Sequence, residues 1–203
     1  MHPAWTSNAH HVRSEQHPKP AMSTAEPVSR LRGLAPVAGP ATRLLLLGSF
    51  PGGASLAARQ YYAHPRNQFW PLLSELFGLE LRAMSYQERL REVLSRGLGI
   101  WDVYAACERE GSLDASIRSA QPNDLAALVR RLPMLQGIAH NGGESARSLR
   151  VTRDLAAHCW RLPSSSPANA SWSFQRKLAA WREVFASCGL LEPRATAAPR
   201  STL

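Results

Sequence analysis

The chain has 203 residues, of which 44% are hydrophobic and 19% charged, so it can bury one core of ordinary domain size and is not disordered as a whole. No apolar run reaches about 18 residues, which excludes a membrane-spanning helix. Lys and Arg total 24 against 15 acids, and the resulting net charge of +9 favours a polyanionic partner such as nucleic acid. All but two of these cations, Lys19 and Lys177, are arginines, so a genomic preference for arginine explains the excess equally well.

The cysteines and the N-terminal composition bear on the cellular compartment. Cys107, Cys159 and Cys188 are widely separated, which fits neither a disulfide framework nor a four-ligand metal or iron–sulfur site. No apolar stretch follows the charges near the N-terminus, so we expect no secretory signal. These features predict a cytoplasmic protein, associated with the nucleoid if it is bacterial. We expect no metal and no organic cofactor.

Composition divides the chain into a domain and two tails. Residues 1–34 are rich in His, Pro, Ser and Ala and have little periodicity, as expected of a loose N-terminal arm. Residues 192–203 (EPRATAAPRSTL) have the same character and predict a loose C-terminal tail. The sequence therefore predicts a single domain over residues 35–191.

Strand-like and helical patterns alternate within that domain. The run Arg43 to Phe50 is continuously apolar and ends in small residues, which is typical of a strand covered on both faces. Asn123 or Asp124 is a suitable cap for the helical pattern that follows them. In chain order the predicted elements are strand 43–50, helix 86–94, strand 98–105, helix 125–132, strands 136–141 and 158–162, and helix 174–185.

This alternation predicts an α/β fold with three layers, α/β/α, around a central, mostly parallel sheet of four strands. In such folds, functional sites collect at the carboxyl ends of the strands. We therefore expect the chemistry to lie just after Leu47, after Val103, near Asn141 and after Leu162.

The first unusual segments follow the first predicted strand. Gly48-Ser49-Phe50-Pro51-Gly52 comes directly after it and, taken alone, is equally typical of an ordinary turn. The next segment, YYAHPRNQFW over residues 61–70, places two tyrosines, a histidine, an arginine and an asparagine in a predicted loop. Stacking rings and exposed polar groups in such a loop suit a planar base, although Tyr62 and His64 are also compatible with a core position.

Together these segments resemble the first motif of the uracil-DNA glycosylase superfamily, with the deoxyinosine (hypoxanthine) DNA glycosylases as the most similar branch. Two later segments match in the same order, IAHNG at residues 138–142 and LPSSSPANA at residues 162–170. The resemblance covers roughly residues 35 to 190. It implies the fold of that superfamily and a DNA glycosylase of base-excision repair, a hydrolase acting on N-glycosyl bonds.

The first motif departs from the superfamily at one position. Mismatch-specific relatives carry Asn, and other branches carry acids, where this chain has Phe50, and a phenyl ring cannot orient water. The deoxyinosine branch is similar in lacking that residue. There the resemblance assigns catalysis to the Asn of the HPRN segment, here Asn67, and base recognition to Asn141.

The resemblance also assigns supporting roles around the base. Backbone amides near Ser49 and Phe50 are expected to contact it, and Tyr62 is expected to stack on it, with Tyr61 as the alternative. His64 either donates a hydrogen bond to the leaving base or braces the loop.

The last motif is assigned to DNA binding. The segment Ser164-Ser165-Ser166-Pro167-Ala168-Asn169 is where the resemblance places the contacts that pinch the DNA backbone, and hydroxyls and loop amides bind phosphates without reading sequence. A plain surface loop is the alternative for a Ser-Pro-Ala stretch. Residues 140–183 hold seven cations against three acids, which favours the DNA-binding interpretation.

The leading hypothesis is thus a monofunctional glycosylase, expected to act as a monomer, that removes hypoxanthine from DNA, with uracil as a second candidate base, and leaves an abasic site. Lyase chemistry needs an amine nucleophile, and neither Lys19 in the arm nor Lys177 in the last helix is well placed. Two alternatives remain open: a mismatch-specific uracil or thymine glycosylase, and a non-catalytic module that senses lesions.

Overall fold

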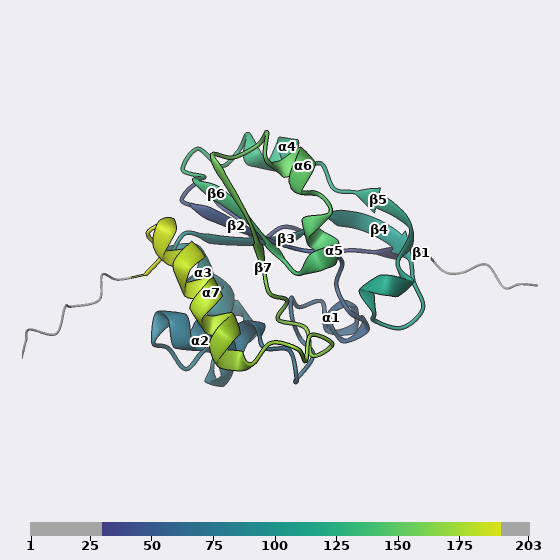
Figure 1. The fold of residues 1–203 in the computed structure, drawn as a ribbon, viewed down its shortest axis with the longest axis horizontal. Coiled ribbons are helices and arrows are strands. Elements are labelled where there is room, and N and C mark those ends of the chain that lie inside the picture. Colours follow the sequence, from purple (N-terminus) through teal and green to yellow (C-terminus); the bar gives the residue numbers. More distant parts are fainter. Residues whose placement is uncertain (1–29, 192–203) are drawn as a thin grey trace, which may run out of the picture.

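The computed structural model describes residues 30–191, and its centre is a four-stranded parallel sheet (Figure 1). The strands are β2 (Leu44–Gly48), β3 (Leu98–Asp102), β6 (Gly137–Asn141) and β7 (His158–Leu162), in the spatial order β3-β2-β6-β7. All three neighbouring pairs are parallel. This confirms the predicted central sheet.

Helices cover both faces of this sheet, because side chains of β2 alternate between two cores. Leu44 and Leu46 pack with the longer helices α2 (Phe69–Phe77), α3 (Tyr86–Ser95) and α7 (Phe174–Ser187). Leu45 and Leu47 pack on the opposite side, with α4 (Leu125–Val129). Figure 1 shows α2, α3 and α7 below the sheet and α4 above it, the predicted three layers.

The remaining helical elements are short and lie in the loops that connect the layers. They are α1 (Gly53–Ala58), η1 (Leu81–Ala83), η2 (Asp114–Ser116), α5 (Gly143–Ala146) and α6 (Leu149–Thr152).

Helix starts follow the local sequence closely. Ser85 and Glu88 form a reciprocal capping box at α3, and the Asp124 side chain accepts a hydrogen bond from the Ala127 amide at α4. Asp124 rather than Asn123 is therefore the cap. The predicted loop at residues 61–70 is shorter than expected, because α2 begins within it at Phe69.

A second, antiparallel sheet lies beside the first, in the order β1-β4-β5. Its strands are β1 (Arg30–Arg32), β4 (Tyr104–Glu108) and β5 (Arg118–Pro122). The predicted strand 98–105 is thus wrong as a single element: it breaks at Val103, whose amide donates to the Gly48 carbonyl as the chain leaves the parallel sheet. β5 is exposed throughout, so it has no apolar pattern to reveal it.

The second sheet also changes the domain boundary. The sequence assigns residues 1–34 to a loose arm, but Arg30–Arg32 pair with β4, and the Gly33 amide donates to the Ala105 carbonyl. Residues 30–34 therefore belong to the fold. The rest of the predicted arm and the predicted tail 192–203 lie outside the described residues. Within residues 30–191, no helix is both long enough and apolar enough to cross a membrane.

Candidate active site

The carboxyl ends of the parallel strands open into one cavity of about 1020 Å³. The last residues of all four strands line it, and these are Gly48, Asp102, Asn141 and Leu162. This is the edge where parallel α/β sheets place their sites.

Two groups of side chains line the cavity. We call the first the carboxamide wall, which consists of Tyr62, Asn67, Asn141 and Ser165. We call the second the carboxyl wall, which consists of Ser49, Phe50, Asp102 and Asp114. The sequence predicted site roles for every residue of the first wall but for only two of the second.

Tyr62 is held by stacking on one side. Its ring lies parallel to the Phe69 ring at a centroid distance of 3.8 Å, and its backbone has a φ of 56°, a left-handed conformation that is costly for a tyrosine. Tyr61 is a core residue instead, because it is only 3% exposed and its hydroxyl donates to the Ala35 carbonyl. Of the two stacking candidates, Tyr62 is the one in contact with Asn141.

Asn67 lines the cavity and is half-buried. Its Oδ1 accepts a hydrogen bond of 2.9 Å from the Phe69 amide, which fixes the carboxamide at the start of α2. An amide oxygen has two lone pairs, so a second donor can still reach this atom. Among the described residues no partner is found for Nδ2. The carboxamide is therefore oriented by the protein and retains hydrogen-bonding capacity.

His64 lies in the same turn and also lines the cavity. Its Nδ1 is 3.2 Å from the Arg66 amide and accepts from it, and the His64 carbonyl accepts from the Asn67 amide at 2.8 Å. An acceptor at Nδ1 places the proton of the neutral ring on Nε2. The residue thus braces the turn and has Nε2–H left to donate, so both proposed roles of His64 stay predictions.

Asn141 is the centre of the carboxamide wall. Its Nδ2 donates to Ser165 Oγ at 2.9 Å and to the Tyr62 hydroxyl at 3.2 Å, and its Oδ1 accepts from the Ser165 amide at 2.9 Å. Both amide protons are therefore engaged by the protein. What remains for a base is the second lone pair of Oδ1, which can accept from an N–H such as N1–H of hypoxanthine.

His140 precedes Asn141 on β6 and is fully buried. Its two ring nitrogens lie 2.9 Å from Ser145 Oγ and 2.8 Å from Thr152 Oγ1, and the Ser145 hydroxyl donates to the Leu47 carbonyl. Burial lowers the pKa of His140 to about 4, so the ring is neutral near pH 7. Through Ser145, this histidine links β6 to β2 and so fixes the strand end that carries Asn141.

The carboxyl wall begins at the end of β2. Ser49 Oγ donates to Asp114 Oδ1 at 2.6 Å. The Phe50 ring is 6% exposed and lies under the Arg109 guanidinium, 5.1 Å from its carbon, and Arg109 Nη2 donates to the Pro51 carbonyl at 2.6 Å. Phe50 is therefore a packed residue that fixes the turn, which agrees with its inability to hold water.

Asp102 ends β3 and is 4% exposed, and its Oδ2 has no hydrogen-bond partner among the described residues. Burial raises the pKa of Asp102 to about 8, and the negative charge of Asp114 is the second cause of this rise. The residue lies in the register position beside Gly48 on β2, at the cavity. Asp102 was not among the site residues predicted from the sequence, although a carboxyl inside the apolar run 98–105 is the signal that would have identified it.

The Ser-rich segment forms the rim of the cavity. Pro167 and Ala168 are exposed, and Ser164, Ser166 and Asn169 are half-buried, so all five remain accessible to DNA in part.

Ser165 differs from the rest of this segment. It is fully buried, with its amide and hydroxyl bonded to Asn141 and its carbonyl accepting from Gln68. The expectation that Ser165 contacts DNA is therefore wrong, because it holds the segment in place from inside.

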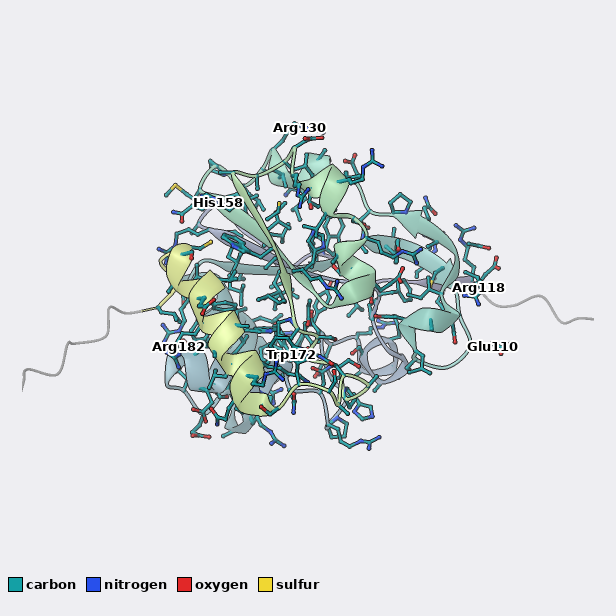
Figure 2. The ribbon with its side chains drawn as sticks, viewed as in Figure 1. Glu110, Arg118, Arg130, His158, Trp172 and Arg182 are labelled. Carbon is teal, nitrogen blue, oxygen red and sulfur yellow. The ribbon has the colours of Figure 1, made fainter. Side chains whose placement is uncertain are left out.

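Lys177 of α7 joins this segment to the turn of Asn67. Its Nζ donates to Gln68 Oε1 at 2.8 Å and to the Asn169 carbonyl at 2.9 Å. Beside it Trp172 is 36% exposed with the Arg176 guanidinium 4.3 Å from its ring centroid, near the start of α7 (Figure 2). An exposed aromatic and a cation at the rim suit a nucleic-acid surface.

Comparison with known proteins agrees with this arrangement. The family model of the uracil DNA glycosylase superfamily matches residues 36–185. Two proteins named hypoxanthine DNA glycosylase, from Methanosarcina barkeri and Methanosarcina acetivorans, are each 36% identical to this chain over 154 residues, which is 76% of this chain and 97% of each relative. The solution NMR structure of a Methanosarcina acetivorans protein described as a uracil DNA glycosylase has a TM-score of 0.71 and 34% identity, and covers 79% of this chain and 99% of that one.

The chain belongs to the uracil DNA glycosylase superfamily. The resemblance drawn from three short segments is thereby confirmed, and so is the expected fold. Both walls of the cavity lie within the matched residues of this superfamily member. No comparison tests the roles of individual residues, so those of Asn67, His64, Tyr62, Asn141 and the Ser-rich rim stay predictions.

Within residues 30–191, no group of three or more His, Cys, Asp or Glu side chains is arranged to hold a metal ion.

Proposed function

We propose that the protein is a DNA glycosylase that hydrolyses the N-glycosidic bond of deoxyinosine, releasing hypoxanthine and leaving an abasic site. Membership of the superfamily and relatives named hypoxanthine DNA glycosylase support this substrate. The single observation that carries the proposal is the position of Asn67, which lines the cavity with an oriented carboxamide that retains free hydrogen-bonding capacity.

The substrate must leave the duplex to reach this cavity. An enzyme cannot act on a glycosidic bond inside stacked bases, so the nucleotide is extruded, at a cost of a few kcal/mol that is smallest for a mispaired base. The cavity volume of about 1020 Å³ is ample for a purine nucleoside. Tyr62 lines the cavity, and because Phe69 covers one face of its ring, the base is proposed to stack on the other.

Asn67 positions the hydrolytic water in this mechanism. Its Oδ1 accepts one hydrogen bond from the Phe69 amide, and its second lone pair accepts one from water facing the anomeric carbon. A carboxamide is no strong base, so its contribution comes from position. The sugar acquires oxocarbenium character first and the held water then adds to it, with most of the acceleration coming from orientation and preorganised dipoles.

Asn141 reads the base. Its Oδ1 retains a lone pair for N1–H of hypoxanthine, a group that adenine lacks, while its amide protons keep Tyr62 and Ser165 in place. A site built to pair with a substrate N–H discriminates strongly against analogues without it.

Hydrolysis without strand cleavage follows from the place of Lys177. A lyase needs a free amine to form a Schiff base, and the amine of Lys177 donates to Gln68 and Asn169 outside the cavity lining. We therefore propose a monofunctional enzyme. Both walls come from one chain, which supports action as a monomer, and a substrate in chromosomal DNA supports a cytoplasmic location, at the nucleoid if the cell is bacterial.

The test is release of free base by Asn67→Ala from a duplex that contains one deoxyinosine. We expect the rate of release to fall at least ~1000-fold, since the water loses its only fixed acceptor, while affinity for the duplex changes less than about threefold. Gln121→Ala is the matched control, because this carboxamide lies on exposed β5 and is expected to leave the rate unchanged. Undiminished release by Asn67→Ala would refute the proposal.

The same assay on a panel of duplexes separates the remaining interpretations. Wild-type protein is incubated with inosine, uracil, xanthine and thymine mispairs in one sequence context. Fastest release from the inosine duplex supports the proposal. Fastest release from uracil or mispaired thymine supports a mismatch-specific enzyme, and binding without release from any duplex supports a lesion sensor.

A further inference from the structure

The buried carboxyl of Asp102 has no role in the mechanism above. It lies at the end of β3, lines the cavity and is 4% exposed. The peptide group that follows Asp102 is fixed through both of its polar atoms: the Asp102 carbonyl accepts from Asn123 Nδ2 at 2.9 Å, and the Val103 amide donates to the Gly48 carbonyl. The chain thus holds an acid rigidly at the one edge of the sheet where substrate binds.

Gly48 makes room for this carboxyl. A Cβ atom at Gly48 would collide with Asp102 Oδ1 and lie 3.4 Å from the Tyr62 hydroxyl. The carboxyl therefore occupies the space above β2 that any other residue type would fill, close to the ring on which the base is proposed to stack. Asp102 therefore lies beside the position in which the extruded base is proposed to stack on Tyr62.

The hydrogen-bonding capacity of the Asp102 carboxyl is not satisfied by the described residues. Its Oδ2 is buried and has no partner within residues 30–191, which is costly for a group of this kind unless a ligand completes it. The titratable and charged groups that act on it are Asp114, Arg109, Tyr61 and Tyr62. Only the Arg109 guanidinium favours ionisation.

Burial, and after it the charge of Asp114, raise the pKa of Asp102 to about 8. Near neutral pH the side chain is therefore a carboxylic acid whose O–H can donate. A departing hypoxanthine needs such a donor, because a purine that leaves without a proton leaves as an anion, whereas one protonated on a ring nitrogen such as N7 leaves neutral. Purines offer N7 and O6 as acceptors on one edge.

We propose that Asp102 is the general acid of this enzyme and transfers its proton to the purine ring as the glycosidic bond breaks. The inference rests on the proposed function and adds a catalytic residue to it. The electron pair of the C1′–N9 bond goes to the base, which accepts the proton of Asp102 and departs as neutral hypoxanthine. Water held by Asn67 adds its oxygen to C1′ and loses one proton to solvent, and the Asp102 carboxylate takes up a proton from solvent, which restores the acid.

The rate of bond breaking as a function of pH tests this assignment in single-turnover reactions on the inosine duplex. For wild-type protein we expect a constant rate below about pH 7 and a fall approaching tenfold per pH unit above about pH 8, since only the protonated acid works. Asp102→Asn keeps the shape of the side chain but has no proton to transfer. At pH 7 the rate of Asp102→Asn should be at least about 100-fold lower than that of wild type. Between pH 7 and pH 10 it should no longer fall.

Two further variants separate acid catalysis from a structural effect. Asp114→Asn removes the neighbouring negative charge, which should move the fall in rate to lower pH by lowering the pKa of Asp102. Glu110→Gln makes the same acid-to-amide change at an exposed site on the edge of the molecule and should leave the profile unchanged (Figure 2). Titration of the ¹³C-labelled Asp102 carboxyl in free protein should give a midpoint near pH 8.

The outcomes separate this inference from the function on which it rests. A wild-type protein that releases no base refutes both. If the wild type releases hypoxanthine while Asp102→Asn keeps the full rate, the inference alone is wrong. It is wrong also if Asp102→Asn is slow but retains the alkaline fall, because the side chain then acts only by position.

Discussion

The two walls of the cavity differ in how far their polar atoms are paired. In the carboxamide wall, Asn141 exchanges three hydrogen bonds with Tyr62 and Ser165, and the wall is further tied to the α7 side by Lys177. In the carboxyl wall, Oδ2 of Asp102 is buried without a partner among the described residues. The centre of the carboxamide wall is therefore paired in the free protein, whereas the carboxyl wall keeps a buried oxygen without a partner among the described residues.

The contrast separates positioning from reaction. Paired networks hold side chains in one geometry and resist change, whereas a buried group left unpaired stores free energy that a substrate can recover on binding. The carboxamide wall is therefore expected to contribute to stability and orientation together. The carboxyl wall is expected to cost stability and to act on the substrate.

The largest combined loss of stability and activity should come from breaking the carboxamide wall at its centre. Asn141→Leu keeps the branching of the side chain at Cγ but removes three hydrogen bonds and leaves the buried amide and hydroxyl of Ser165 unpaired. We expect the free energy of unfolding in urea to fall by about 3 kcal/mol and base release to fall at least ~100-fold.

Asn67→Ala is the informative comparison for that variant, because the Asn67 side chain makes one hydrogen bond and the Asn141 side chain makes three. It should lose activity at a cost of about 1 kcal/mol or less in stability. Equal losses of stability in the two variants would contradict the view that Asn141 carries the network.

The sequence located the carboxamide wall from its motifs and from strand order. Asn67 lies in the predicted loop 61–70 and was assigned from the resemblance of that segment, whereas Asn141 ends a predicted apolar strand, and parallel strands bring such ends to one edge of the sheet. The four central strands were found for a similar reason, since strands such as Leu44–Gly48 are buried on both faces and read as continuous apolar runs.

The carboxyl wall and the second sheet escaped prediction because neither has a local pattern. Arg118–Pro122 is exposed at every position and is a strand only because Tyr104–Glu108 pairs with it. Asp102 looks like the polar end of a strand, and its significance comes from burial and from the charge of Asp114 twelve residues later. Such effects depend on tertiary contacts, which no spacing in the sequence encodes.

The pH dependence of the free energy of unfolding should show how much stability the carboxyl wall costs. The pKa of Asp102 is raised to about 8 in the folded protein, while an unfolded Asp titrates near pH 4. Between these values the folded state binds more protons than the unfolded state, so this group lowers the free energy of unfolding as pH rises from 4 to 8.

Asp102→Asn removes that dependence. Its stability relative to wild type should rise by about 5 kcal/mol from pH 4 to pH 8, measured by urea unfolding at each pH. Glu110→Gln is again the control and should show no such rise. If Asp102→Asn lost stability relative to wild type as pH increased, Asp102 would be ionised and paired in the folded protein, and the contrast between the walls would disappear.

The smallest effect should come from the link between the two loops of the carboxamide wall. Lys177→Met keeps most of the aliphatic stem but removes donors to Gln68 and the Asn169 carbonyl, which should cost about 1 kcal/mol of unfolding free energy and weaken duplex binding several-fold. Arg130→Met removes one positive charge at an exposed site on the opposite edge of the molecule from Trp172, and so measures the effect of charge alone (Figure 2). Because the Lys177 amine orders the rim and does not attack the sugar, neither wild type nor Lys177→Met should cut the DNA strand. If wild type cut the strand and Lys177→Met did not, Lys177 would instead be the nucleophile.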